Sequence, residues 1–447
     1  MSGRLRILFL TPGSGGGFYC ENCLRDAVLL RTLHRRGHDA FMVPLYLPVW
    51  DEWGGAGGSS RVFFGGVKIY LTERFPFLKV FAPLLDKIAD SPFVLALAAR
   101  GARLTRPSEL GPTTCSMLRG EEGRQAEEID RLAAYLKSTG RPDVVILSNA
   151  LLAGLARKLK AELSVPVVCQ LQGEHTFLDE LRSPYREEAW NLLKGRLADI
   201  DMLIAASRFY RDYMAGRLGV PAERIEVLYN GIDLEPYPVS GKPPDRPTVG
   251  YLSRLYPGGG LDLLVEAFLR LRREEGLGHV QLLAAGGHTA EDRAFLRSLR
   301  RRIRRSGAAD AVRFLPNLEG ERRRAFLQEI SVLSVPALNE AFGYFVLEAL
   351  AVGRPVVLPR SGAFTEIVEA TGGGLLCQPG DPEALAASLK RLLSDREECR
   401  RLGLAGRRAV EKRFQVNQAA GNLVQLLKKV LCVAGTGGVG PADSVSE

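Results

Sequence analysis

One pattern occurs twice in the chain and constrains its fold more than any other feature. In the first half, the apolar run Arg6–Leu10 leads into a glycine-rich turn, Gly13–Gly17, and then into a helical pattern, Glu21–Arg36. In the second half, Thr248–Ser253 leads into Gly258–Gly260 and another helical pattern. Strand, glycine turn and helix are the start of a βαβ unit, so two copies predict two parallel-sheet domains.

Further apolar runs fit the same architecture. They are short, rich in β-branched residues and bounded by turn residues, as buried parallel strands are. We predict these strands at Ala40–Leu47, Asp143–Leu147, Val165–Leu171, Met202–Ala205, Ile225–Leu228, Val280–Ala285, Ser331–Val335 and Pro355–Pro359. The predicted fold class is α/β, with two Rossmann-like parallel-sheet domains.

Length and composition place the domain boundaries. A chain of 447 residues is longer than one hydrophobic core usually serves. The segment 236–247 contains five prolines among polar residues, which is typical of a linker. We therefore place one domain at residues 1–238 and the other at residues 239–414.

Three segments depart from this regular pattern. The periodicity weakens over about residues 50–120, which we interpret as an irregular insertion without an assigned task. The helix predicted at 415–432 follows the second domain, and we expect it to cross back to the first. The tail 433–447 is rich in glycine and serine, which predicts disorder.

The charge balance limits the partners of the chain. Sixty lysines and arginines against 51 acidic residues give a net charge of +9, which favours an anionic partner. No segment resembles a nucleic-acid-binding module, so we expect no nucleic acid. No apolar run approaches the roughly 20 residues of a membrane span. Seven cysteines, an odd number, favour free thiols in a reducing compartment, so we expect a cytoplasmic protein.

Two sequence patterns suggest metal sites, and we reject both. Cys20 and Cys23, followed by His34 and His38, imitate a zinc-finger spacing. If Cys23 and His34 share one helix, they lie about 16 Å apart, whereas zinc ligands lie about 2.0–2.3 Å from one ion. The acids of Asp199–Asp201 precede a buried strand, where we expect a structural role. We therefore predict no metal.

The first glycine turn is a candidate phosphate site. Gly15, Gly16 and Gly17 precede a helix, where several backbone N–H groups point at one anion. A plain tight turn is the alternative. A dinucleotide fold would also place an acid at the end of the second strand, but Pro44–Pro48 contains none, which disfavours NAD.

The most informative motif lies at residues 336–357. It contains Glu340 and Glu348, separated by seven residues, and then a strand that opens with Gly-Arg-Pro-Val-Val. Glu340 follows a strand, at the edge where open α/β sheets bind ligands. The segment Phe342–Tyr344 would open a helix and offer free N–H groups to a diphosphate. Two hydroxyl acceptors beside an anion site suit a nucleotide sugar, whereas a bare pair of glutamates would be solvated.

With these motifs the chain resembles the family 4 glycosyltransferases, retaining enzymes of the GT-B architecture, in which two Rossmann-like domains face each other across a cleft. The resemblance covers most of the chain and is most specific from Val249 to Arg413. Besides Glu340 and Glu348, the matching positions are Arg254, Ala206–Tyr210, Asn230–Asp233, Ser361–Val368 and Pro379–Leu385. The resemblance implies a nucleotide-diphospho-sugar as co-substrate, without a cofactor or metal.

The resemblance also implies roles for individual residues. Glu340 would contact the hydroxyls of the donor sugar, Glu348 would hold the ribose and Arg254 would bind the diphosphate. The further donor contacts implied are Asn339, Phe342, Gly343 and Tyr344 in the second domain. Gly15, Gly16 and Gly17 of the first domain would close over the diphosphate or the acceptor across the cleft.

Two positions depart from the family pattern. The family usually has a lysine where this chain has Gly259, so one phosphate cation is missing. A hydrogen bond to a charged group is worth about 1.5–3 kcal/mol. Its loss predicts a slower enzyme unless another basic side chain takes the place of the lysine. Gln172 stands in the place of a usual histidine, and His175 stands in the place of an acid. We assign both to the catalytic group, with a structural role for His175 as the alternative.

We therefore predict a retaining hexosyltransferase with an unidentified acceptor. The alternatives are an inactive nucleotide-sugar-binding protein and a sugar-nucleotide epimerase of the same fold. A helical run, Arg297–Arg305, is rich in arginine and is interpreted either as a solvated face or as a peripheral contact with an anionic membrane, at its inner face.

Overall fold

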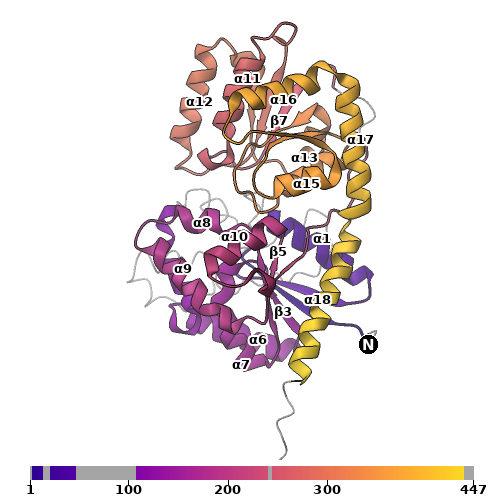
Figure 1. Ribbon diagram of the computed structural model, residues 1–447. Coiled ribbons are helices and arrows are strands. Elements are labelled where there is room, and N and C mark those ends of the chain that lie inside the picture. Colours follow the sequence, from indigo (N-terminus) through magenta and orange to yellow (C-terminus); the bar gives the residue numbers. More distant parts are fainter. Residues whose placement is uncertain (1–2, 14–20, 47–106, 240–243, 437–447) are drawn as a thin grey trace, which may run out of the picture.

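The structure is a computed structural model that describes residues 3–13, 21–46, 107–239 and 244–436. These residues form two parallel sheets of six strands each, which confirms the predicted α/β class. Figure 1 shows one sheet with its helices above the other. Gly15, Gly16 and Gly17 and most of the predicted insertion lie outside the described residues.

The first sheet has the strand order β2-β1-β3-β4-β5-β6. Its strands are β1 (Arg6–Thr11), β2 (Asp39–Pro44), β3 (Val144–Leu147), β4 (Val167–Leu171), β5 (Met202–Ala205) and β6 (Ile225–Val227). Its helices are α1 (Glu21–Arg35), α5 (Gly111–Arg119), α6 (Ala126–Thr139), α7 (Ala156–Leu163), α8 (Glu174–Glu180), α9 (Tyr185–Arg196) and α10 (Arg208–Leu218).

The second sheet has the order β12-β11-β10-β7-β8-β9. Its strands are β7 (Thr248–Leu252), β8 (Gln281–Ala285), β9 (Val312–Leu315), β10 (Val332–Leu333), β11 (Val356–Pro359) and β12 (Gly374–Cys377). The helices that follow in this half are α11 (Leu261–Leu271), α12 (Arg293–Arg305), α13 (Gly320–Glu329), α14 (Tyr344–Ala351), α15 (Ala363–Thr371), α16 (Pro382–Ser394), α17 (Arg396–Arg413) and α18 (Val416–Thr436).

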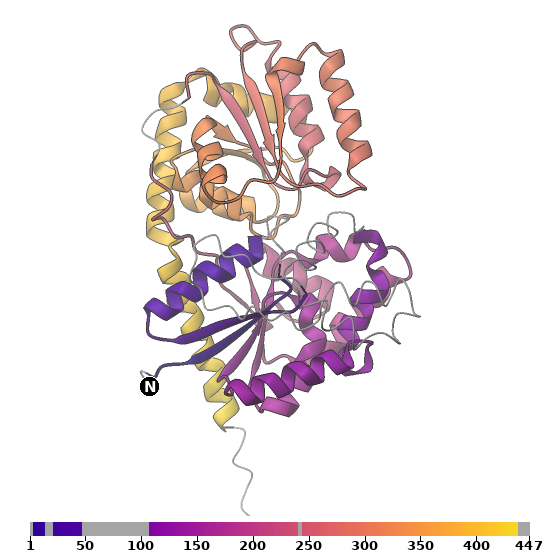
Figure 2. The same cartoon turned by 180° about the vertical axis from the view of Figure 1, so that it is seen from behind.

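The last helix, α18, packs on the first sheet although it follows the second. Successive side chains of a strand point to opposite faces. Phe9 of β1 therefore lies in one core layer with Val28 of α1 and Leu423 of α18, while Leu8 faces the layer of α6, α7 and α9 on the other side. Figure 2 shows α1 and α18 side by side over this face.

The chain thus passes between the domains twice, and the two crossings are hydrogen bonded to each other. The N–H of Ile232 donates to the carbonyl of Phe414 (2.8 Å), and the N–H of Val416 donates to the carbonyl of Ile232 (3.1 Å). Gly231 fits here because a Cβ would lie 2.5 Å from the Cα of Val416. Among the described helices, none is long and apolar enough to cross a bilayer.

Candidate functional site

A cavity of about 740 Å³ lies between the two domains, within the usual size range of small-molecule sites. The first domain contributes α8 and Tyr213 of α10 to its wall. The second domain contributes the turn after β7 and the loop after β10, where Leu338 and Asn339 lie. Because β7 and β10 present their carboxyl ends here, the cavity occupies the position where open α/β sheets bind ligands.

Arg254 lines this cavity, as expected from its place after β7. Its guanidinium lies 3.3 Å from a carboxylate oxygen of Asp292 and 3.5 Å from one of Glu180, which belongs to the first domain. It also lies over the ring of Tyr256, 4.6 Å from the centroid. Arg254 is therefore held at the cavity wall by one acid from each domain.

The cavity wall is acidic. Five carboxylates line it, against the single guanidinium of Arg254 among the described residues: Asp179, Glu180, Asp262, Glu291 and Asp292. Asp292 is buried and accepts hydrogen bonds from the N–H (2.7 Å) and hydroxyl (2.8 Å) of Thr289, which fixes it beside Arg254. The sequence pattern did not single out these acids, because they come from three separate segments of the chain that meet only in the folded protein.

The loop of Glu340 lies beside the cavity. Asn339 has a φ of +58°, a left-handed conformation that asparagine tolerates better than most residues. The carboxylate of Glu340 accepts a hydrogen bond from the N–H of Ala341 (3.2 Å), and burial raises the pKa of Glu340. The hydroxyl of Ser207, from the first domain, donates to the carbonyl of Ala341 (2.7 Å). Asn339 lines the cavity, whereas Glu340, the next residue in the chain, is not among the residues that line it.

The start of α14 follows this loop. Gly343 has a φ of +82°, and a Cβ there would lie 2.8 Å from the ring of Phe364, so glycine is required. The side chains of Phe342 and Tyr344 are buried, and the Tyr344 hydroxyl donates to the carbonyl of Gly231 (3.3 Å). None of Phe342, Gly343 and Tyr344 is among the residues that line the cavity, and the two buried side chains leave only the backbone at a helix N-terminus for a ligand.

The structure does not bring Glu348 into the cavity. Its side chain is fully buried and accepts hydrogen bonds from Nε and Nη2 of Arg323 (2.8 and 2.5 Å) and from the hydroxyl of Tyr237 (3.0 Å). Arg323 is also buried, on α13. The predicted ribose contact would require this carboxylate to leave an ion pair in the domain core.

Gln172 and His175 are separated by the turn that joins them. The N–H of Gln172 donates to the carboxylate of Glu174 (2.8 Å), and Gln172 lines a small cavity beside Arg25 of α1. His175 lines the interdomain cavity instead, and its Nδ1 lies 3.2 Å from the hydroxyl of Tyr210. Burial lowers the pKa of His175, so the ring is neutral near neutral pH.

The acids of the rejected metal pattern have structural partners. Asp201 accepts a hydrogen bond from the N–H of Val167 (2.8 Å) and pairs with Lys160 (2.8 Å). Asp199 pairs with Arg157 (3.3 Å). These contacts attach β4 and α7 to the segment that precedes β5. Cys20 of the zinc-like pattern lies outside the described residues.

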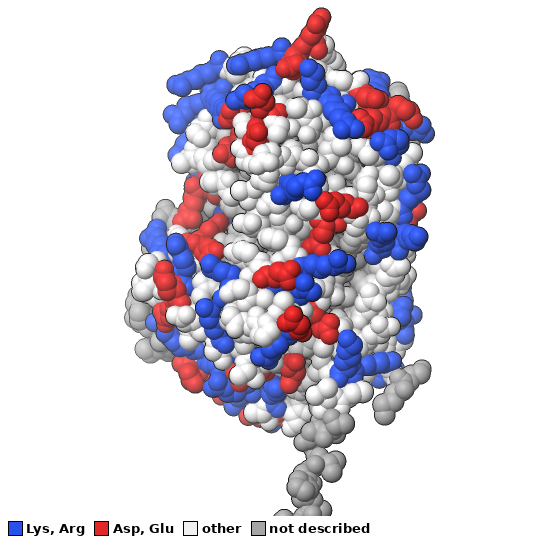
Figure 3. All heavy atoms as spheres, in the orientation of Figure 1, with Lys and Arg blue, Asp and Glu red and all other residues white. Residues whose placement is uncertain are grey.

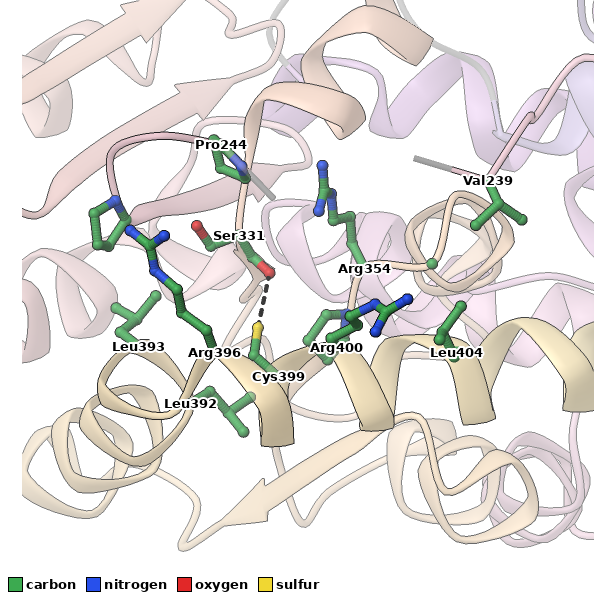
Figure 4. A pocket seen from close by; sticks show the side chains of 13 residues that line it. Val239, Pro244, Ser331, Arg354, Leu392, Leu393, Arg396, Cys399, Arg400 and Leu404 are labelled. Atoms are coloured by element: carbon green, nitrogen blue, oxygen red, sulfur yellow. Dashed lines mark hydrogen bonds between the residues drawn. The ribbon is translucent and has the colours of Figure 1, made fainter. Parts of the chain in front are cut away.

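A second cavity, of about 110 Å³, lies at the other end of the second sheet. Figure 4 shows Arg354 and Arg400 at its border, with the thiol of Cys399 donating to the carbonyl of Ser331 (3.5 Å). Ser331 precedes β10, so this cavity faces the amino ends of the strands. Ligands of open α/β sheets bind at the carboxyl ends, and we place the site in the interdomain cavity.

Comparison with known proteins identifies the family. The sequence model of the group 1 glycosyl transferases matches residues 237–409, and that of glycosyltransferase family 4 matches residues 94–236. Together these segments exceed two thirds of the chain. The protein belongs to the family 4-type glycosyltransferases.

Two proteins similar in sequence to this glycosyltransferase come from bacteria. The D-inositol 3-phosphate glycosyltransferase of Xylanimonas cellulosilytica is 31% identical over 245 residues, which are 52% of this chain and 57% of that protein. The GDP-mannose-dependent alpha-(1-6)-phosphatidylinositol monomannoside mannosyltransferase of Mycobacterium tuberculosis is 28% identical over 394 residues, 81% of this chain and 94% of that protein. The chain thus spans little more than half the length of the Xylanimonas relative.

Solved structures share the fold. The sucrose-phosphate synthase of Thermosynechococcus elongatus superimposes with a TM-score of 0.72 and 19% identity, over 96% of this chain and 100% of that one. Anabaena HepE, solved in complex with UDP and glucose, gives a TM-score of 0.65 at 18% identity, over 95% of this chain and 100% of that one. The predicted GT-B architecture is confirmed.

The geometry explains one departure of this glycosyltransferase from the family pattern. Gly259 is buried, and a Cβ there would lie 2.2 Å from the hydroxyl of Tyr251. That hydroxyl donates to the carbonyls of Arg254 (2.9 Å) and Gly259 (3.2 Å). Tyr251 thus holds the turn that carries Arg254, and a lysine at position 259 would displace it.

Proposed function

We propose that the protein transfers a sugar from a nucleotide-diphospho-sugar to an acceptor hydroxyl, with retention of configuration and without a metal ion. The observation that supports this most is the position of Arg254, on the wall of a cavity between two facing sheets at the carboxyl ends of their strands. The HepE structures hold UDP or UDP-glucose, and the M. tuberculosis relative depends on GDP-mannose by name. UDP-glucose and GDP-mannose are both nucleotide-diphospho-sugars, and UDP is what remains of such a donor after the sugar has left.

In the proposed reaction the bond between the anomeric carbon and the diphosphate breaks while the acceptor oxygen bonds to the same face of that carbon. The acceptor proton passes to the departing phosphate oxygen. Arg254 and the N–H groups at the start of α14 would stabilise the charge on that oxygen. Glu340 would accept hydrogen bonds from sugar hydroxyls. Neutral His175 would orient the sugar through hydrogen bonds, because the neutral ring does not act as a general acid near neutral pH.

The ion pairs of Arg254 define what donor binding requires. A diphosphate beside the guanidinium would face the carboxylates of Glu180 and Asp292 at close range. Asp292 is fixed by Thr289, whereas among the described residues the carboxylate of Glu180 is hydrogen bonded to Arg254 alone. We expect the Glu180 side chain to turn away from Arg254 when the donor enters. This movement would release the contact between α8 of the first domain and the second domain.

A donor screen tests this function. The protein is mixed with UDP-glucose, GDP-mannose and related nucleotide-sugars, and thermal stabilisation identifies the donor. Release of the nucleotide diphosphate in the presence of acceptor mixtures, unchanged by EDTA, would support metal-independent transfer. NMR of the product anomer would test retention. Stabilisation without nucleotide release would show a binding protein, and interconversion of the free donor without an acceptor would show an epimerase.

A further inference from the structure

The helix α12 of the second domain forms an unusually basic surface. Seven of its 13 residues are arginines and none is acidic. Its apolar side chains Leu296, Leu299 and Ile303 are buried in the domain core, while all its arginines are exposed. The apolar face is already covered by protein, so the exposed face can act on a partner through charge alone.

An open groove of about 750 Å³ runs between α11 and α12. It is lined by five arginines and one acid: Arg270, Arg273, Arg301, Arg302, Arg305 and Glu266. Glu266 pairs with Arg270 (3.0 Å) and Arg302 (2.9 Å). Within the described residues no ion pair joins Arg273, Arg301 or Arg305 to an acid. Figure 3 shows Lys and Arg side chains gathered over this part of the second domain.

The groove and the interdomain cavity are connected by α12 itself. Glu291 and Asp292 line the cavity, and Arg293 is the first residue of α12. A helix of 13 residues is about 20 Å long. A partner bound along α12 therefore lies within about one helix length of the proposed sugar-transfer site.

The chemistry of the groove favours a lipid surface over nucleic acid. The arginines of the groove repel one another, which destabilises the folded protein. An anionic partner would reduce this repulsion. None of the lining residues is aromatic, so bases would have no ring to stack on. A nucleic-acid strand that followed α12 to its start would meet the exposed carboxylate of Glu291. The headgroups of a membrane touch only the exposed side of the helix.

We propose that the α11–α12 groove docks the protein on an anionic membrane by binding the phosphate groups of acidic lipids. The docked orientation would present the interdomain cavity to acceptors carried in that membrane. The second statement rests on the proposed function, whereas the docking does not.

Flotation with lipid vesicles tests the docking. The full chain is expected to float with vesicles of phosphatidylcholine and phosphatidylglycerol, to stay behind with phosphatidylcholine alone, and to be released by salt. The triple variant Arg273→Gln, Arg301→Gln, Arg305→Gln should lower the partition constant on the order of a hundredfold, because each basic residue near an anionic surface contributes about one kcal/mol.

A matched control removes the same charge elsewhere. The variant Arg400→Gln, Arg401→Gln, Arg408→Gln changes three exposed arginines of α17, which lies on the opposite side of the second domain from α12 (Figures 1 and 2). It should float as the unchanged protein does. Equal flotation of both triple variants, or no dependence on phosphatidylglycerol, would overturn the proposal. So would retention of an RNA or DNA duplex by a protein that ignores the vesicles.

Donor assays separate this inference from the proposed function. Nucleotide release with a water-soluble acceptor should be the same in the α11–α12 variant and the unchanged protein. Vesicle binding without sugar transfer would leave the docking standing and refute the transferase. Sugar transfer without vesicle binding would support the transferase and refute the docking.

Discussion

Arg254 of the second domain and Glu180 of the first form an ion pair across the cleft, with 3.5 Å between Nη1 and Oε2. The same guanidinium is the residue that we assign to the donor diphosphate. A carboxylate of one domain therefore occupies a place that the donor anion would take on the other.

Replacing that carboxylate should strengthen donor binding. In Glu180→Gln the guanidinium of Arg254 is no longer paired across the cleft, and no negative charge repels the phosphate. Because a partly exposed ion pair is worth at most about 1 kcal/mol, the dissociation constant of the donor should fall up to about fivefold. Titration calorimetry measures it. Glu291→Gln, which neutralises another acid of the same cavity, is the control, and equal affinity in both variants would refute the competition.

Removing the guanidinium should have the opposite effect. A charge-assisted hydrogen bond is worth about 1.5–3 kcal/mol, so Arg254→Ala should lower kcat/KM by about ten- to a hundredfold. Arg254→Lys keeps the charge but not the planar fork, and should recover part of the loss. Steady-state kinetics of nucleotide release measure this. An unchanged kcat/KM in Arg254→Ala would remove this residue from the site.

The loop after β10 allows a direct test of Glu340. Glu340→Ala should abolish sugar transfer while the fold is kept, because the donor sugar would lose the carboxylate that accepts hydrogen bonds from its hydroxyls. Circular dichroism and the thermal midpoint check folding, and product formation checks transfer. Glu369→Ala, at an exposed carboxylate of α15 that does not line the cavity, is the control. A Glu340→Ala enzyme with normal turnover would exclude this assignment.

Most of the fold could be predicted because buried parallel strands have a strong pattern. Met202–Ala205 was predicted at both ends, as the structure has it. The strands missed were β9 and β12, which are the two edges of the second sheet. Each is only partly buried, β9 includes the exposed Arg313, and β12 opens with Gly374. An edge strand is covered less completely, so its sequence is less uniformly apolar.

The site was less predictable because its partners come from distant parts of the chain. The motif around Glu340 and Glu348 suggested two acids that face a ligand. Only the folded chain shows that Arg323, 25 residues earlier, pairs with Glu348 inside the domain. Likewise, the approach of Glu180 to Arg254 depends on how two separate sheets dock. A local pattern identifies residue types but not the contacts that occupy them.

The buried pair of Arg323 and Glu348 predicts a specific stability pattern. Arg323→Met leaves the carboxylate without its cation in the core, which should cost about 3–5 kcal/mol and lower the thermal midpoint. Adding Glu348→Gln removes the remaining charge and keeps an acceptor for Tyr237, so the midpoint should largely recover. Calorimetry of the two variants checks this. If the double variant is no more stable than Arg323→Met alone, the uncompensated charge of Glu348 is not the cause of the lost stability.

His175 should make stability depend on acid. Burial lowers the pKa of its ring below the ordinary 6.5, and Asp179 and Arg217 act on it in opposite directions. The unfolded chain then binds a proton more readily, so this contribution is complete above pH 6.5 and is lost as the pH falls below it. Melting curves of the native protein and His175→Gln should converge as the pH falls from 7 towards 5. Parallel curves would contradict this.

The return of α18 to the first sheet affects how the protein can be divided. A fragment that stops in the linker would expose the layer formed by Phe9 and Val28 to water. A fragment that starts there would carry Leu423 and its apolar neighbours with nothing to cover. Neither half of the gene encodes a self-contained folding unit, and an isolated first domain would have to be built as a circular permutant with α18 joined to its start.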